Sequence, residues 1–185
     1  MKYSDLIIAG VPKSFDIWDS IEYLQPLQEG MNPDDILYDA YPAECDEGKG
    51  EDACVIFKYN DSSTGIEVVH TSSLQRLSVW LSPWAVEADV LLYASFVNAV
   101  LAKHKKARLY DGCVELQCLN DDVIEQMIFE RKSYLKRLLT TKEGFTMEGL
   151  NAGFSLNVSH LKPATSLDMQ VTELQRQFVQ SQWEF

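Results

Sequence analysis

Four cysteines and three histidines are the side chains of this chain best suited to nucleophilic or metal chemistry. The cysteines stand at positions 45, 54, 113 and 118, and the histidines at 70, 104 and 160. Cys113 and Cys118 are too far apart for the two-residue gap that is typical of zinc sites and redox pairs. Cys45 lies between two carboxylates, which disfavour the thiolate of a reactive cysteine. We predict no structural zinc, and a catalytic pair of Cys113 or Cys118 with His104 would depend on the tertiary fold.

Other short catalytic signatures are weak or missing. Ser133 and Lys136 satisfy the S-x-x-K spacing, which puts a lysine one helical turn from a serine, but a lysine-rich helix produces this pattern by chance. The chain contains no P-loop, no G-x-G-x-x-G and no G-x-S-x-G pattern. The sequence therefore predicts no cofactor and no standard nucleotide site.

The strongest chemical feature is an excess of carboxylates near the beginning of the sequence. The 185 residues include 28 acidic and 16 basic side chains, for a net charge of −12, and residues 1–70 hold 15 of the acidic but only 4 of the basic ones. Such a field repels nucleic acid and anionic lipid and attracts basic proteins. An acidic surface also serves solubility without any partner. We expect a basic protein partner, no nucleic acid and no membrane.

Two groups of residues are candidates for binding that partner. The acidic loop 44–52 would steer association, and two tryptophans would act as anchors, which makes the candidate binding residues Asp46, Glu47, Glu51, Asp52, Trp80 and Trp84. Leu77, Val79 and Leu81 alternate with polar residues as in a half-buried strand, so Trp80 points to the other side of the sheet. Burial under a helix is the commoner fate of such a residue, whereas exposure is typical of an interface anchor.

Periodicity predicts the elements that must position these residues. Strands are expected at 6–11, 53–59, 66–71, 76–81, 107–111 and, once or twice, within 144–160. Helices are expected at 14–25, 32–41, 83–104, 120–138 and 165–178 from their apolar spacing and capping residues.

This order predicts an α+β fold with a central, largely antiparallel sheet. A three-stranded meander at about 53–81 would be joined by further strands and four to five helices. We predict a single domain over 1–185, with a possible minor boundary at the acidic loop 44–52. No apolar run is long enough to span a membrane, and few cysteines and no secretory pattern favour a cytoplasmic location.

Two functions of different classes remain open on the sequence alone. The first is an acidic cytosolic interaction protein, such as an inhibitor, an immunity-type protein or a regulatory subunit, which binds a basic protein through its acidic N-terminal third. The alternative is a small hydrolase-like enzyme with a dispersed site of Asp and Glu from 34–52 and either His70 or His160. The absence of catalytic motifs favours the first.

Overall fold

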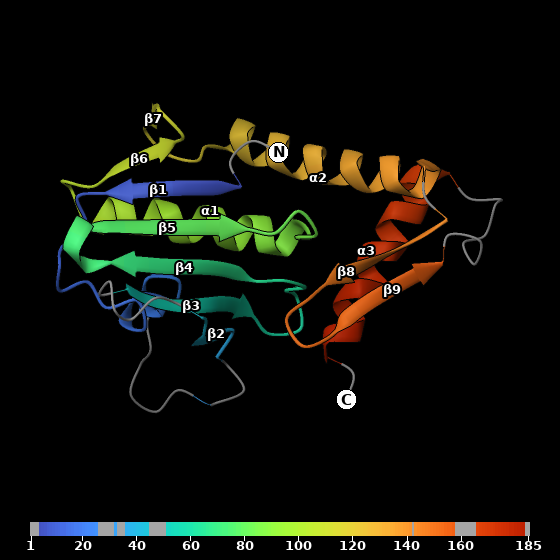
Figure 1. The fold of residues 1–185 in the computed structure, drawn as a ribbon, viewed down its shortest axis with the longest axis horizontal. Helices are drawn as coiled ribbons and strands as arrows, with labels where there is room; N and C mark the ends of the chain where they lie inside the picture. Colours follow the sequence, from blue (N-terminus) through green and yellow to red (C-terminus); the bar gives the residue numbers. More distant parts are fainter. Residues whose placement is uncertain are drawn as a thin grey trace.

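The chain is described by a computed structural model that covers residues 4–25, 32, 36–44, 51–141, 143–157 and 166–183. Within these ranges, seven strands form one antiparallel sheet in the order β2-β3-β4-β5-β1-β6-β7, and two more form a separate hairpin (Figure 1). The strands of the large sheet are β1 (Asp5–Ala9), β2 (Tyr38–Pro42), β3 (Glu51–Lys58), β4 (Ile66–Thr71), β5 (Arg76–Leu81), β6 (Arg108–Asp111) and β7 (Val114–Leu116). The hairpin consists of β8 (Gly144–Glu148) and β9 (Gly153–Asn157).

Helix α1 covers one face of the large sheet. The α-helices are α1 (Glu87–Lys103), α2 (Asp121–Thr141) and α3 (Leu167–Trp183), and short 3-10 helices are η1 (Asp19–Tyr23) and η4 (Ser72–Leu74). Helix α1 contacts β3, β4 and β5, and it passes behind the sheet in Figure 1. Because side chains alternate between the faces of a strand, Leu77, Val79 and Leu81 of β5 all point to the helix side and are fully buried.

A buried carboxylate fixes the beginning of α1 against the sheet. Asp89 is fully buried, and its two oxygens accept hydrogen bonds from the backbone N–H groups of Ser63, Thr64, Gly65 and Val86 at 3.0–3.2 Å. The hydroxyl of Ser63 adds a further donor at 2.8 Å. These donors belong to the turn between β3 and β4 and to the residue before α1. Asp89 therefore joins the turn to the helix.

Two apolar clusters are linked by the long helix α2. The first lies between the large sheet and α1 and includes Met127 of α2. The second contains Leu135 and Leu139 of α2, together with Phe178 of α3 and Met147 of β8. In Figure 1, α2 runs from the top of the sheet toward α3 and the hairpin. The same helix thus buries its two halves in different clusters.

The predicted α+β class and large antiparallel sheet are confirmed, but the predicted number of helices is too high. The described part of the chain has three α-helices where four to five were expected. The prediction of a helix at 32–41 is wrong where the structure describes it, because Tyr38–Pro42 is a strand that pairs with β3. The capping pattern at Asn32 is a local signal, and pairing with β3 satisfies the backbone of this segment instead. The helix expected at 14–25 is only the short η1.

Among the described residues, no helix combines the length and apolar character that crossing a membrane requires.

Candidate interaction surface

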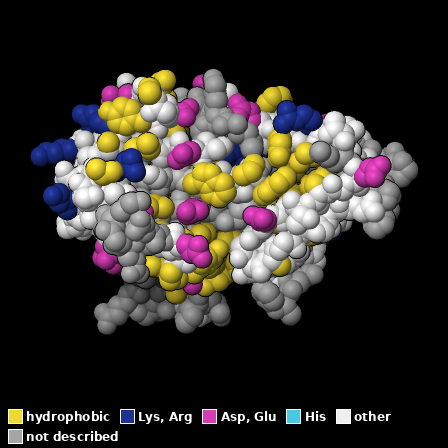
Figure 2. All heavy atoms as spheres, viewed as in Figure 1, with side chains coloured by type: hydrophobic (Ala, Val, Ile, Leu, Met, Phe, Trp, Pro, Cys, Tyr) yellow, Lys and Arg dark blue, Asp and Glu magenta, His cyan; other side chains and the backbone are white. Residues whose placement is uncertain are grey.

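An ordered row of side chains crosses the face of the sheet opposite α1, here named the open face because Asp5 and Trp80 are exposed on it. The register pairs Tyr41 with Val55, Val55 with Glu67, Glu67 with Trp80, and Trp80 with Asp5. Directly opposed residues on antiparallel strands share one face, so these five form a continuous line, here named the Trp80 row. Beside the Tyr41 end of the row, Trp183 of α3 packs against Phe57, with 5.8 Å between ring centroids. In Figure 2, hydrophobic and acidic side chains share the centre of this face, whereas most basic ones lie at its margins.

Trp80 lies between Glu67 and Asp5 in this row and is accessible to a partner. Its side chain is 44% exposed, so the burial expected as the commoner outcome does not occur. Its two cross-strand neighbours are the carboxylates Glu67 and Asp5. Side chains in such positions have Cβ atoms about 4.5–5.5 Å apart. A cationic side chain that lies over the indole would therefore have a carboxylate within reach on either side.

A groove of about 420 Å³ borders the row where the sheet meets β8. Both predicted tryptophans line it, Trp80 from β5 and Trp84 from the segment before α1, and two carboxylates join them, Glu67 and Glu148. Trp84 is half-buried because its ring stacks on Phe145, with 6.1 Å between ring centroids and 9° between planes. One tryptophan is thus free to contact a partner while the other forms a fixed wall.

The predicted acidic residues are not gathered in one loop. Glu51 and Asp52 belong to strand β3, so the acidic loop expected at 44–52 is shorter than predicted at this end. Glu51 shares the open face with Trp80 but pairs with Thr71, about 13 Å along the strand from Glu67 at the usual rise per residue. Asp52 lies on the helix side, opposite His70. Asp46 and Glu47 are outside the described residues.

The residues of the alternative enzymatic site are only partly brought together. Asp52 and His70 are cross-strand partners, but His70 is 4% exposed and lies against Phe15, with 5.5 Å between ring centroids. Burial lowers the pKa of His70, although Asp52 acts in the opposite direction. The neighbouring Cys54 is fully buried, and burial raises the pKa of its thiol to about 12. His160 and the acidic residues 34–35 are outside the described residues.

The pairing of Cys113 or Cys118 with His104, which the sequence left open, gains no support from the structure. Cys113 and Cys118 are free and exposed, while His104 lies against Phe15 and Tyr23 rather than in an acid–base arrangement with a thiol. No three potential metal ligands of the His, Cys, Asp or Glu type converge in the part of the chain that the structure describes.

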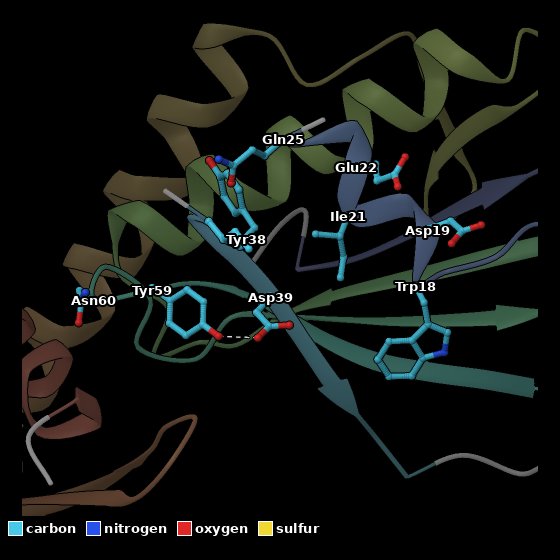
Figure 3. Close-up of a pocket in the computed structure, with 10 residues that line it drawn as sticks. Trp18, Asp19, Ile21, Glu22, Gln25, Tyr38, Asp39, Tyr59 and Asn60 are labelled. Carbon is cyan, nitrogen blue, oxygen red and sulfur yellow. Dashed lines mark hydrogen bonds between the residues drawn. The ribbon is translucent and has the colours of Figure 1, made fainter. Parts of the chain in front are cut away.

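A second cavity lies beside the edge strand β2 and was missed by sequence reasoning. It holds about 720 Å³ and is lined by aromatic and acidic side chains from η1, β2 and the end of β3 (Figure 3). The phenol of Tyr59 donates a hydrogen bond to Asp39 across it. The aromatic residue Trp18 stands between the carboxylates Asp16 and Asp19 in sequence, which is the signal that could have suggested this site.

Comparison with known proteins adds no further guide, because no protein family, curated protein or solved structure matches this chain.

Proposed function

We propose that this protein is an acidic interaction protein that binds a basic protein partner across the open face of its sheet. The observation that carries the proposal is the position of Trp80, exposed and flanked by Glu67 and Asp5 in a row of paired residues. Exposed tryptophans are frequent energetic centres of interfaces, and flanking carboxylates select a cationic contact. An inhibitor, an immunity-type protein and a regulatory subunit all fit this mode of action.

The distribution of charge supports a basic rather than a neutral or acidic partner. Glu67, Asp5 and Glu148 border the groove and the row, and none of the described residues that line the groove is basic. Steering by such carboxylates speeds association with a basic surface and repels phosphate groups, so nucleic acid is not the partner proposed here. Free Cys54, Cys113 and Cys118 agree with a reducing, cytosolic setting.

The experiment uses the whole protein as an affinity matrix for native cell extract at about 0.1 M and about 1 M salt. The Debye length falls from about 10 Å to about 3 Å over this range, so a steered complex weakens. We expect a stoichiometric basic protein that is released at high salt. Its affinity for purified Trp80→Ala should then be at least about 30-fold weaker, because truncation of a central anchor costs about 2 kcal/mol or more.

A matched pair of charge reversals locates the surface. Glu67→Lys changes the row, whereas Glu125→Lys makes the same change at an exposed position on α2. Slower association with Glu67→Lys and an unchanged rate with Glu125→Lys support the proposal. It is overturned if no basic protein is retained at low salt, or if the retained protein binds Trp80→Ala and Glu67→Lys as well as it binds the unchanged chain.

A further inference from the structure

The cavity beside β2 is separate from the groove next to Trp80. It is formed by η1, by the residues that enter and begin β2, and by the residues that follow β3. Its lining residues are Trp18, Asp19, Ile21, Glu22, Gln25, Ile36, Tyr38, Asp39, Tyr59 and Asn60. None of these residues lines the groove beside Trp80. Its volume of about 720 Å³ lies within the range of small-molecule sites in proteins.

Three carboxylates give the cavity its charge. Asp19 and Glu22 come from η1 and Asp39 from β2, and the described lining residues include no lysine or arginine. None of the three forms an ion pair with a described Lys or Arg: the nearest lysine in sequence to this wall, Lys58, pairs with Asp61 at 2.5 Å. The site therefore favours a ligand that carries positive charge.

Aromatic rings provide the second kind of contact. Trp18 and Tyr59 are each 37% exposed. Tyr38, which lines the same cavity, is half-buried. The faces of such rings attract cations, and they also pack against methylene groups. Asp39 is held in place because it accepts hydrogen bonds from Tyr59 and, at 2.8 Å, from the backbone N–H of Ala40. The cavity thus combines fixed acidic and aromatic groups.

The separation of these groups decides which cation fits. In Figure 3, Asp39 lies on β2 next to Tyr59, whereas Asp19 and Glu22 project from η1 on the side turned away from Asp39. A single metal ion needs ligands that converge, and the described residues contain no group of three that could hold one. An extended molecule with several cationic centres reaches both sides, while its apolar links pack against Trp18 and Ile21.

We propose that this cavity binds a linear aliphatic polyamine, with its ammonium groups on Asp39 and on Asp19 and Glu22, and its methylene chain along the aromatic wall. This activity goes beyond the binding of a basic protein, because it uses a different part of the surface. The polyamine enters and leaves as a whole cation, so binding involves no covalent step.

Spermidine is the probe, and titration calorimetry of the full chain at low salt is the measurement. We expect saturable binding of one spermidine per chain. Each lost charge pair at a partly exposed site contributes only modestly to binding. Because three such pairs are lost together, the triple variant Asp19→Asn, Glu22→Gln, Asp39→Asn should bind spermidine at least about tenfold more weakly. Glu22→Gln alone, at an exposed position, should give a smaller loss in the same direction, so the result does not depend on the folding of the triple variant.

A second triple variant separates the cavity from general attraction to an acidic protein. Asp121→Asn, Asp122→Asn, Glu125→Gln removes the same charge from the exposed surface of α2 and should leave spermidine affinity within about twofold. A change of tryptophan fluorescence on binding that disappears in Trp18→Phe places the ligand in this cavity. Equal losses in the two triple variants overturn the proposal, and so does binding of Mg²⁺ or hexylamine as tight as that of spermidine.

Discussion

At the scale of single residues, the carboxylate of Asp89 links the β3–β4 turn to the first turn of α1. Its Oδ2 accepts from Ser63, Thr64 and Val86, and its Oδ1 accepts from the backbone N–H of Gly65. An asparagine at this position would have one oxygen and one NH2 group in place of the two carboxylate oxygens. In either orientation of the amide, the NH2 group would face backbone N–H donors instead of accepting from them. Each buried donor left without an acceptor costs about 1–3 kcal/mol.

The first prediction is that Asp89→Asn strongly destabilises the protein although it barely changes side-chain volume. We expect the free energy of unfolding to fall by about 3 kcal/mol, measured by urea denaturation with circular dichroism. Glu125→Gln, the same carboxylate-to-amide change at an exposed position of α2, should change it by less than about 0.5 kcal/mol. Equal stability of Asp89→Asn and the unchanged chain would show that this hydrogen-bond network contributes little.

The second prediction concerns pH and His70. Burial lowers the pKa of His70. Its Nε2 is buried and has no hydrogen-bond partner among the described residues. The unfolded chain therefore binds a proton at this histidine more readily than the folded chain does. Its contribution to stability is fully present above the unfolded pKa, about 6.5, and is lost as the pH falls through the lower pKa of the folded state.

Acid titration of stability tests this sign. Unfolding free energies of the unchanged chain and of His70→Leu are compared at pH 7.5 and pH 5. We expect the unchanged chain to lose more stability between the two values, because the leucine has no proton to bind. His104, whose pKa is also lowered by burial, is present in both proteins and therefore contributes to both pH dependences. The same pH dependence in both proteins would contradict the assignment.

At the scale of elements, helix α2 contains a buried cation. Arg131 is 1% exposed, donates to the carbonyl of Met127 at 3.2 Å and to the hydroxyl of Ser4 at 3.3 Å, and forms no ion pair with a described carboxylate. Burial lowers the pKa of its guanidinium to about 10. Two neutral acceptors compensate poorly for the removal of a charge from water.

The third prediction is a contrast between two substitutions of Arg131. Arg131→Met keeps the length and apolar stem of the side chain and removes the charge, so stability should stay equal or rise by about 1 kcal/mol. Arg131→Ala leaves a cavity under α2 and should lower stability by about 2 kcal/mol or more. Thermal unfolding measures both. Equal destabilisation by the two variants would mean that the hydrogen bonds of the guanidinium, rather than its packing, stabilise this helix.

The same scale shows which parts of the fold are readable in the sequence. The long apolar run of α1 and the alternation in β5 are local signals, and the helix and the half-buried strand that they predict are both confirmed. The segment before β2 has a helix-start pattern, but Tyr38–Pro42 is a strand because the following strand β3 supplies its hydrogen-bond partners. β7 was missed, although Asp111-Gly112 with its positive φ at Gly112 is a hairpin signal.

The candidate sites also combine features that local sequence predicts with features that depend on the tertiary structure. Alternation along β5 places Trp80 on the face away from the core, so its orientation follows from local pattern alone. Its neighbours Glu67 and Asp5 depend on the register between strands, which one sequence does not specify. The cavity beside β2 combines Trp18 and Asp39 in one lining through tertiary packing, and for that reason it could not be predicted from spacing.

At the scale of the whole molecule, α2 couples the two apolar clusters. Met127 belongs to the first cluster, and Leu135 and Leu139 belong to the second. The beginning of α1 is also shared, because Val86 lies in the second cluster while Val90 lies in the first. Neither cluster can come apart without exposing one end of a helix that the other holds. We therefore predict a single cooperative unit over 1–185 rather than two domains.

The fourth prediction tests this coupling with one substitution in each cluster. Val97→Ala weakens the first cluster, and Phe178→Ala, at a residue 1% exposed, weakens the second by about 3–5 kcal/mol. If the molecule unfolds as one unit, Phe178→Ala should reduce hydrogen-exchange protection in β1 and β5 as much as in α3, because the most protected amides then exchange only through global unfolding. Val97→Ala should lower the protection of the slowest-exchanging amides in β1, β5 and α3 alike, by the smaller amount of stability that this substitution removes. A loss confined to α3, β8 and β9 in Phe178→Ala would instead divide the chain into two independently stable parts.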